Sequence, residues 1–138
     1  MAERIRLEEF GKQLASLDRS LRLLAEEEDA EKRLSFRSAV VADFQLAFEL
    51  CWKACQELAK FEETVVRKPK ESVTFLKETG LIQSTDLFEA MIDSRNRSTH
   101  IYGQDMVDSM LPYIKEDFAQ LLHEIHYALL RRYSEKRA

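Results

Sequence analysis

Apolar residues recur every three or four positions through most of this chain, the spacing that places them on one face of an α-helix. The first such stripe predicts a helix from Ile5 to about Glu28. It supplies about one apolar residue per turn: Phe10, Leu14, Leu17, Leu21 and Leu24. Because the stripe is similar to a heptad repeat, this helix can pack within the chain or across a dimer seam, and the sequence leaves both arrangements open.

A second stripe is more apolar and predicts a long helix, beginning at Glu31 or Ser35 and ending at Lys60, at the centre of the fold. Its inward residues are Phe36, Val40, Phe44, Phe48, Cys51, Cys55 and Leu58.

Two pairs of polar or reactive residues in this second helix have simple expected roles. Cys51 and Cys55 lie four positions apart on the inward face, with no His nearby in the sequence, so we expect buried thiols and no metal site. Glu49 and Lys53 have the spacing of a helical ion pair, and we expect them to form one at the surface.

Two shorter helices follow a loop at residues 64–68. Pro69 is suited to the first position of a helix, and Gly80 can close that helix in the left-handed conformation. Ser84 or Thr85 can then cap a fourth helix, which leads directly into Arg95.

The last part of the chain predicts one interrupted helix. Gly103 ends the preceding helix and Asp105 is expected to cap the new one. Pro112 lies several residues inside it, which predicts a kink or a short helix followed by a longer one. The charged tail at residues 131–138 is expected to fray.

The composition supports an all-α fold in one domain spanning residues 1–138. The chain contains three Gly and two Pro, too few for a sheet with many turns. No apolar run approaches the roughly 20 residues that cross a bilayer, and we expect no secretory leader because Met1 leads into a charged segment. We therefore expect a cytoplasmic protein with reduced thiols. The net charge of −4 excludes a general basic field for nucleic acid, so RNA would have to meet a local cluster such as Arg95 and Arg97.

The segment from Arg95 to Tyr102 contains the best candidate site. An imidazole such as that of His100 can move a proton near neutral pH, and an arginine can stabilise the charge on a phosphate, which together allow RNA cleavage through its own 2′-hydroxyl without a metal. In a continuous helix His100 would be rotated from Arg95 by about 140°, so the two converge only if the helix unwinds or a second subunit completes the site. The simpler alternative is a capped helix end with a hydrogen-bonded His.

Two further histidines, His123 and His126, lie within the apolar pattern of the last helix. We expect ordinary surface or core-edge roles for both.

Two segments resemble a known family. Residues 44–53, Phe-Gln-Leu-Ala-Phe-Glu-Leu-Cys-Trp-Lys, resemble the Phe-x3-Phe-Glu-Leu-x-Trp-Lys signature of nucleotidyltransferase substrate-binding proteins. Residues 80–82 and 93–102 resemble the second signature of that family in order and spacing. The family belongs to the HEPN superfamily, which is marked by Arg-x4-6-His. Here the spacer is four, giving Arg-x4-His-x-Tyr.

The resemblance implies an up-and-down bundle of four to five helices that forms a homodimer, beside a separately encoded minimal nucleotidyltransferase. In the toxin–antitoxin form of such pairs, the HEPN chain is a metal-independent ribonuclease that needs no cofactor, and the transferase neutralises it by moving AMP from ATP onto the motif tyrosine. Carried over, these roles make Arg95 the phosphate stabiliser, His100 the acid–base group, Asn96 a supporting polar residue and Tyr102 the AMP acceptor. Arg97 is not fixed by the motif, and its RNA contact is our inference.

Two functions from different classes remain open at this point. One is an RNA endonuclease toxin controlled by its transferase. The other is a noncatalytic subunit that presents a substrate or nucleotide to the transferase, which the acidic net charge favours because ribonucleases gain affinity by neutralising phosphates. The chain lacks the Gly-Ser and paired-Asp motif of the transferase itself.

Overall fold

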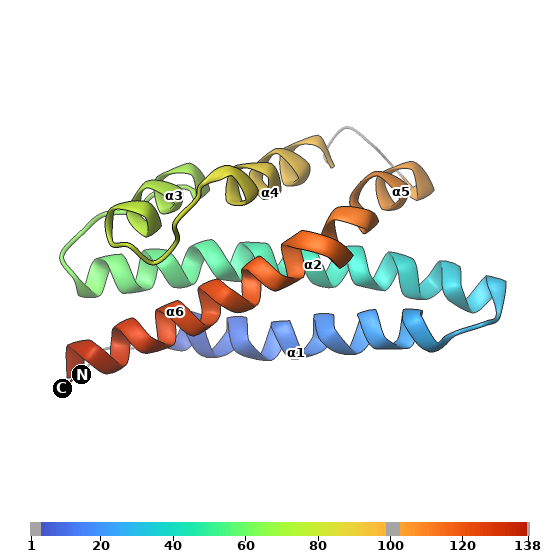
Figure 1. Ribbon diagram of the computed structural model, residues 1–138, viewed down its shortest axis with the longest axis horizontal. Helices are drawn as coiled ribbons and strands as arrows, with labels where there is room; N and C mark the ends of the chain where they lie inside the picture. Colours follow the sequence, from blue (N-terminus) through green and yellow to red (C-terminus); the bar gives the residue numbers. More distant parts are fainter. Residues whose placement is uncertain (1–3, 99–102, 138) are drawn as a thin grey trace.

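The computed structural model describes residues 4–98 and 103–137, which are almost entirely helical. Helices α1 (Ile5–Glu26) and α2 (Ala30–Phe61) form a long antiparallel hairpin (Figure 1). Both helices agree with the predicted ranges to within a few residues.

Side chains around the hairpin turn hold α1 and α2 together. Asp29 caps α2 by accepting a hydrogen bond from the backbone N–H of Lys32. Arg33 donates to the carbonyl oxygens of Leu24 and Glu27 at 2.8 and 2.9 Å, so it satisfies carbonyls at the end of α1 that have no partner within the helix.

Helices α3 (Pro69–Glu78) and α4 (Asp86–Arg97) form a layer on top of the hairpin (Figure 1). As predicted, Pro69 opens α3, and Gly80 follows its end with a φ of +75°, a conformation that glycine adopts without strain. Thr85 occupies the cap position of α4, although its side chain makes no capping hydrogen bond.

The remaining chain forms α5 (Gly103–Tyr113), a π-helical turn (Ile114–Phe118) and α6 (Ala119–Arg137). Pro112 lies two residues before the start of the π-helical turn, which confirms the predicted interruption, because proline removes one helical hydrogen bond and shifts the following register. The predicted cap at Asp105 is wrong, since α5 already begins at Gly103 and Asp105 lies in its first turn.

The observed all-helical bundle agrees with the predicted fold class. Counting α5 to α6 as one interrupted helix, the described residues form five helical segments. Helices α1, α2, α4 and α6 alternate in direction, as in an up-and-down bundle (Figure 1). As predicted, α2 is central: it packs against α1, α3, α5 and α6.

Aromatic side chains join α2 to the elements around it. Phe44 stacks on Phe118 with ring centroids 5.4 Å apart, and Phe48 contacts Phe88 of α4 at 5.8 Å. All four rings are buried. The helix that carries Arg95 is therefore anchored to α2 by core packing.

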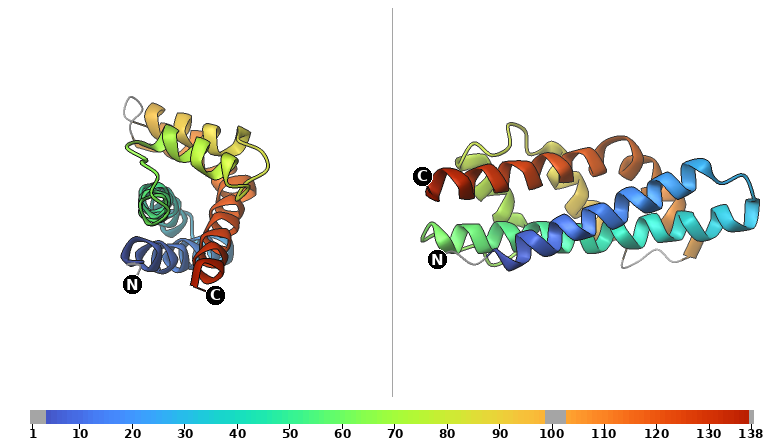
Figure 2. Two further views of the ribbon diagram at one scale, coloured as in Figure 1. Left: turned by 90° about the vertical axis from the view of Figure 1, so that its left-hand side faces the viewer. Right: turned by 90° about the horizontal axis from the view of Figure 1, so that it is seen from below.

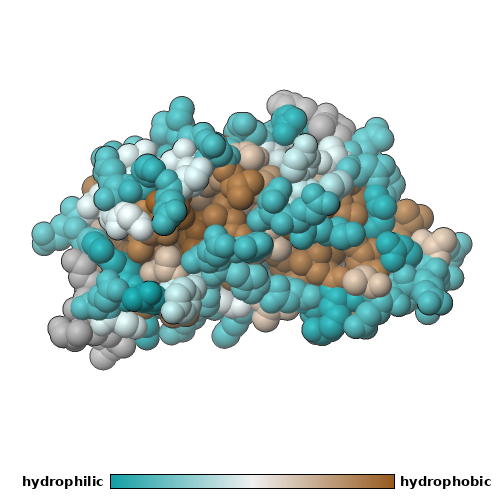
Figure 3. Space-filling model, in the orientation of Figure 1, coloured by the Kyte–Doolittle hydropathy of each residue, from teal (hydrophilic) through white to brown (hydrophobic). Residues whose placement is uncertain are grey.

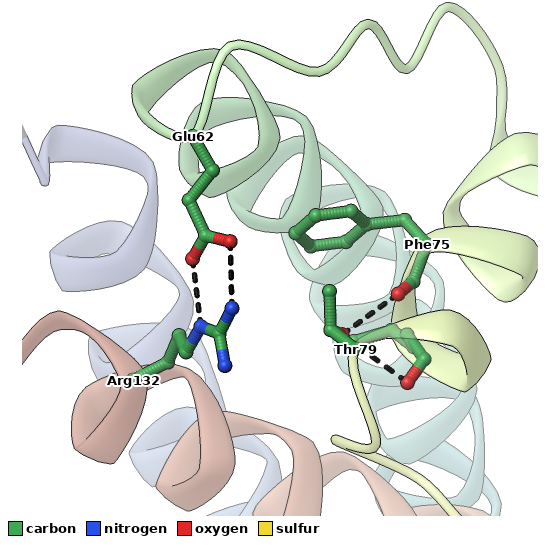
Figure 4. Close-up of polar contacts among 5 residues, drawn as sticks. Glu62, Phe75, Thr79 and Arg132 are labelled. Carbon is green, nitrogen blue, oxygen red and sulfur yellow. Dashed lines mark hydrogen bonds and ion pairs between the residues drawn. The ribbon is translucent and has the colours of Figure 1, made fainter. Parts of the chain in front are cut away.

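Helix α6 extends through the charged C-terminal segment. Fraying from residue 131 was expected, whereas α6 continues to Arg137. Arg132 donates two hydrogen bonds to the Glu62 carboxylate, at 2.8 and 2.9 Å (Figure 4), and Tyr133 is fully buried against Phe61. This two-point ion pair and the buried ring fix the end of α6 beside the end of α2.

The face of the bundle in Figure 3 is mainly hydrophilic, with apolar side chains reaching the surface along its middle. Viewed along the bundle, α2 has α1 below it, the α3–α4 layer above it and α6 to one side (Figure 2, left). Among the described residues, no helix combines the length and the apolar character needed to span a membrane.

The two cysteines are buried and unpaired in the core, as the sequence predicted. Burial is the main cause that raises the pKa of Cys51, so its thiol stays protonated. Cys51 therefore does not behave as a reactive thiolate.

Candidate functional site

Arg95 lies in the last turn of α4, where it meets α2. Its Nε lies 2.8 Å from Oε1 of Glu49 in an ion pair, and its side chain remains 38% exposed. The other carboxylate oxygen of Glu49 accepts from the Trp52 ring nitrogen at 2.9 Å. The Trp52 hydrogen bond therefore orients the carboxylate, and the ion pair holds the guanidinium beside it.

This arrangement corrects the expected role of Glu49. The sequence pattern predicted an ion pair with Lys53, but the structure pairs Glu49 with Arg95 across two helices. The four-residue spacing within α2 favours an ion pair between Glu49 and Lys53 only if the contacts of α2 with other helices are left out. The resemblance offered the missing indication, since Glu49 belongs to one family signature and Arg95 to the other.

A second set of bonds closes the end of α4 beside Arg95. The Ser98 hydroxyl donates to the carbonyl oxygen of Arg95 at 2.6 Å. Gln45 of α2 donates to the Ser98 hydroxyl at 3.3 Å, and its amide also contacts the sulfur of Met106 in α5. Gln45 thus connects α2 with the end of α4 and the beginning of α5.

Asn96 and Arg97 are both exposed, on the part of α4 that faces away from the core. Arg97 lines a small hollow between α4 and α5, together with Ser94, Ser98 and Tyr113. Arg97 and Arg95 are therefore in different surroundings, although they are only two positions apart in the chain.

His100 and Tyr102 lie outside the described residues. Helix α4 ends at Arg97, and α5 begins at Gly103, whose φ is +63°. The convergence of His100 with Arg95, and the role of Tyr102, stay predictions.

The two other histidines have the ordinary positions that the sequence indicated. His123 pairs with Asp18 of α1 at 2.8 Å on the surface. His126 packs its ring edge-on against Phe10, and partial burial, aided by the charge of His123, lowers its pKa. In the described part of the chain, no group of His, Cys, Asp and Glu side chains could hold a metal ion.

The geometry allows Arg95 to bind an anion while Glu49 holds it. Within the described residues, Glu49 is the only carboxylate that forms an ion pair with Arg95. Arginine presents five N–H donors in a planar fork, so a phosphate can be bound by the donors that Glu49 leaves unused.

Two comparisons with known proteins match most of this chain. The family described as nucleotidyltransferase substrate binding protein like matches residues 5–131. A crystal structure of a protein from Thermus thermophilus superimposes with a TM-score of 0.71 and 26% sequence identity, covering 87% of this chain and 98% of that one. A comparison with curated proteins gave no match.

Proposed function

This chain belongs to the nucleotidyltransferase substrate-binding protein-like family, and from that premise we propose that it is a metal-independent RNA endonuclease controlled by a separately encoded nucleotidyltransferase. The observation that carries the proposal is the Glu49–Arg95 pair. It connects the two family signatures in space and holds a partly exposed arginine in place at the start of the Arg-x4-His motif.

The proposed reaction uses the 2′-hydroxyl of the RNA as the nucleophile. His100 accepts the proton of that hydroxyl, the 2′-oxygen attacks the adjacent phosphorus, and the 5′-oxygen of the next nucleotide leaves and takes up a proton. The products are a 2′,3′-cyclic phosphate and a 5′-hydroxyl. Arg95 stabilises the negative charge that builds up on the phosphate oxygens, and Asn96 supports the site as an adjoining polar group.

We place this site in a homodimer, in which two Arg-x4-His motifs face one cleft. The resemblance supports that assembly, and the partial exposure of Arg95 is compatible with it. The long apolar stripe of α1 gives no support, because its leucines, apart from the partly buried Leu21, are buried within the chain against α2 and α6.

His100→Ala tests the nuclease directly. The purified protein, incubated with cellular RNA in EDTA, is expected to cleave it, and His100→Ala is expected to be slower by about 100- to 10,000-fold because the proton acceptor is lost. Products are resolved by denaturing electrophoresis. Absence of cleavage by the wild-type protein, or equal cleavage by both proteins, contradicts the nuclease.

Tyr102→Phe tests the proposed control by the transferase. We propose that the phenol oxygen of Tyr102 attacks the α-phosphorus of ATP, losing its proton and releasing pyrophosphate. With the cognate transferase and ATP, mass spectrometry should detect an added adenylyl group on the wild-type protein and none on Tyr102→Phe. An adenylyl group that persists on the variant excludes Tyr102 as the acceptor.

A noncatalytic subunit is the second candidate, and two observations favour it. The family description names substrate binding alone, and the chain is acidic overall. In this role Arg95 and His100 would bind a phosphate for the transferase without reacting. The cleavage experiment in EDTA distinguishes the two functions, because a binding subunit leaves the RNA intact.

A further inference from the structure

A groove lies where the end of α2, the beginning of α1 and the connection to α3 meet. Its cavity volume is about 1110 Å³, and four of its lining residues are cations: Arg6, Lys53, Lys60 and Arg67. We propose that this α2 groove binds single-stranded RNA and leads it to Arg95. The inference rests on the proposed function for its substrate class.

Two of the charged groups in the α2 groove are already engaged. Arg6 pairs with Glu9 at 3.0 Å. The Glu57 carboxylate accepts the backbone N–H groups of Arg6 and Leu7, at 3.1 and 3.4 Å, so its negative charge stabilises the positive end of α1. Neither group contributes much to binding a further ion.

The other three cations are available to a ligand. Within the described residues, Lys53, Lys60 and Arg67 form no ion pair, and the remaining lining carboxylate is Glu63. An excess of unpaired cations in one groove is unusual for a chain with a net charge of −4. It favours a polyanion as the ligand.

The cations continue the line of the candidate site along α2. Lys53 follows Glu49 by four residues, which places it on the same face one turn further on, and Lys60 lies two turns beyond Lys53. At 1.5 Å per residue, Glu49 and Lys60 are about 16 Å apart along the helix axis. A strand whose phosphate is bound by Arg95 can therefore pass Lys53 and Lys60 in turn.

An exposed aromatic ring in the same groove distinguishes single-stranded RNA from a simple polyanion. Phe61 lines the groove and is 41% exposed. Its ring stacks on the buried Tyr133 with centroids 5.7 Å apart, which holds it in place. Grooves that bind single strands combine cations along the backbone with aromatic rings on which bases stack.

The test measures RNA binding separately from cleavage. A fluorescent single strand of about 12 nucleotides, with every ribose 2′-O-methylated, lacks the attacking hydroxyl and stays intact. Its affinity for the full-length protein is measured by anisotropy over a range of salt concentrations. The test variant is Lys60→Gln with Arg67→Gln, and Arg19→Gln with Arg22→Gln, which removes two exposed cations of α1, is the matched control.

Binding by the test variant is expected to be at least tenfold weaker at low salt. The slope of log K against log salt should fall by about 1.4, because each lost phosphate contact removes about 0.7. The control should bind like the wild-type protein. Equal binding of RNA by the test variant and the control overturns the inference. A test variant that no longer binds the transferase but keeps its RNA affinity also overturns it. If the wild-type protein binds through Lys60 and Arg67 but cleaves no unmodified RNA, the α2 groove stands and the nuclease fails.

Discussion

Arg95→Ala is expected to slow RNA cleavage by about 100- to 1,000-fold, because one positioned donor to a developing negative charge contributes an effect of that size. The loss should appear in kcat, with a smaller change in KM, since the charge grows only in the transition state. The measurement is steady-state cleavage of a defined RNA, with circular dichroism to confirm that the variant is folded. Folding should survive, because a partly exposed side chain is removed at the end of α4.

Arg97→Ala is the matched control for this prediction. Arg97 has the same charge and lies two residues further along α4, but it is exposed and lines the hollow between α4 and α5. Removing it should weaken RNA binding through KM and leave kcat within a few-fold. Equal losses of kcat in the two variants would show that the site depends on positive charge in general and would remove the special role of Arg95.

A variant of Glu49 distinguishes the positioning of Arg95 from the chemistry at the same site. Glu49→Gln keeps the size of the side chain but removes the charge that holds Arg95. We therefore place Glu49 as a positioning residue. Its effect should be smaller than that of Arg95→Ala and should disappear in an Arg95→Ala background, because a positioning residue acts only through the group it positions.

The helices could be predicted because each is encoded locally. The apolar stripes of α1 and α2, Pro69 at the start of α3 and Gly80 after its end all act within a few residues, and the structure has helices at those places. The start of α5 was misplaced because Asp105 and Gly103 are both acceptable starting points, and the sequence does not decide between them.

Contacts between distant elements could not be predicted from local pattern. Glu49 has a possible helical partner four residues away, but its actual partner is 46 residues further along the chain, and only packing of α4 on α2 decides between them. The end of α6 shows the same limit. Its charged sequence is typical of a frayed tail, but Arg132 pairs with Glu62 and Tyr133 is buried in the core.

The packing of α4 on α2 brings the two signatures together, and from it we derive a second prediction with a large expected effect. Phe48→Ala is expected to lower the free energy of unfolding by about 3–5 kcal/mol, the usual cost of removing a buried phenyl ring. Phe48 is fully buried and contacts Phe88, so the cavity would open between α2 and the helix that carries Arg95. Urea denaturation followed by circular dichroism measures the change.

Leu46→Ala is the control on the same helix, since Leu46 is 50% exposed and lies two residues before Phe48. It should change the free energy of unfolding by no more than about 0.5 kcal/mol. If Phe48→Ala and Leu46→Ala cost the same, the Phe48–Phe88 contact does not hold α4 on α2. Helix α4 would then be held mainly by its contacts with α3 and the π-helical turn, because a partly exposed ion pair such as Glu49–Arg95 contributes about 1 kcal/mol or less.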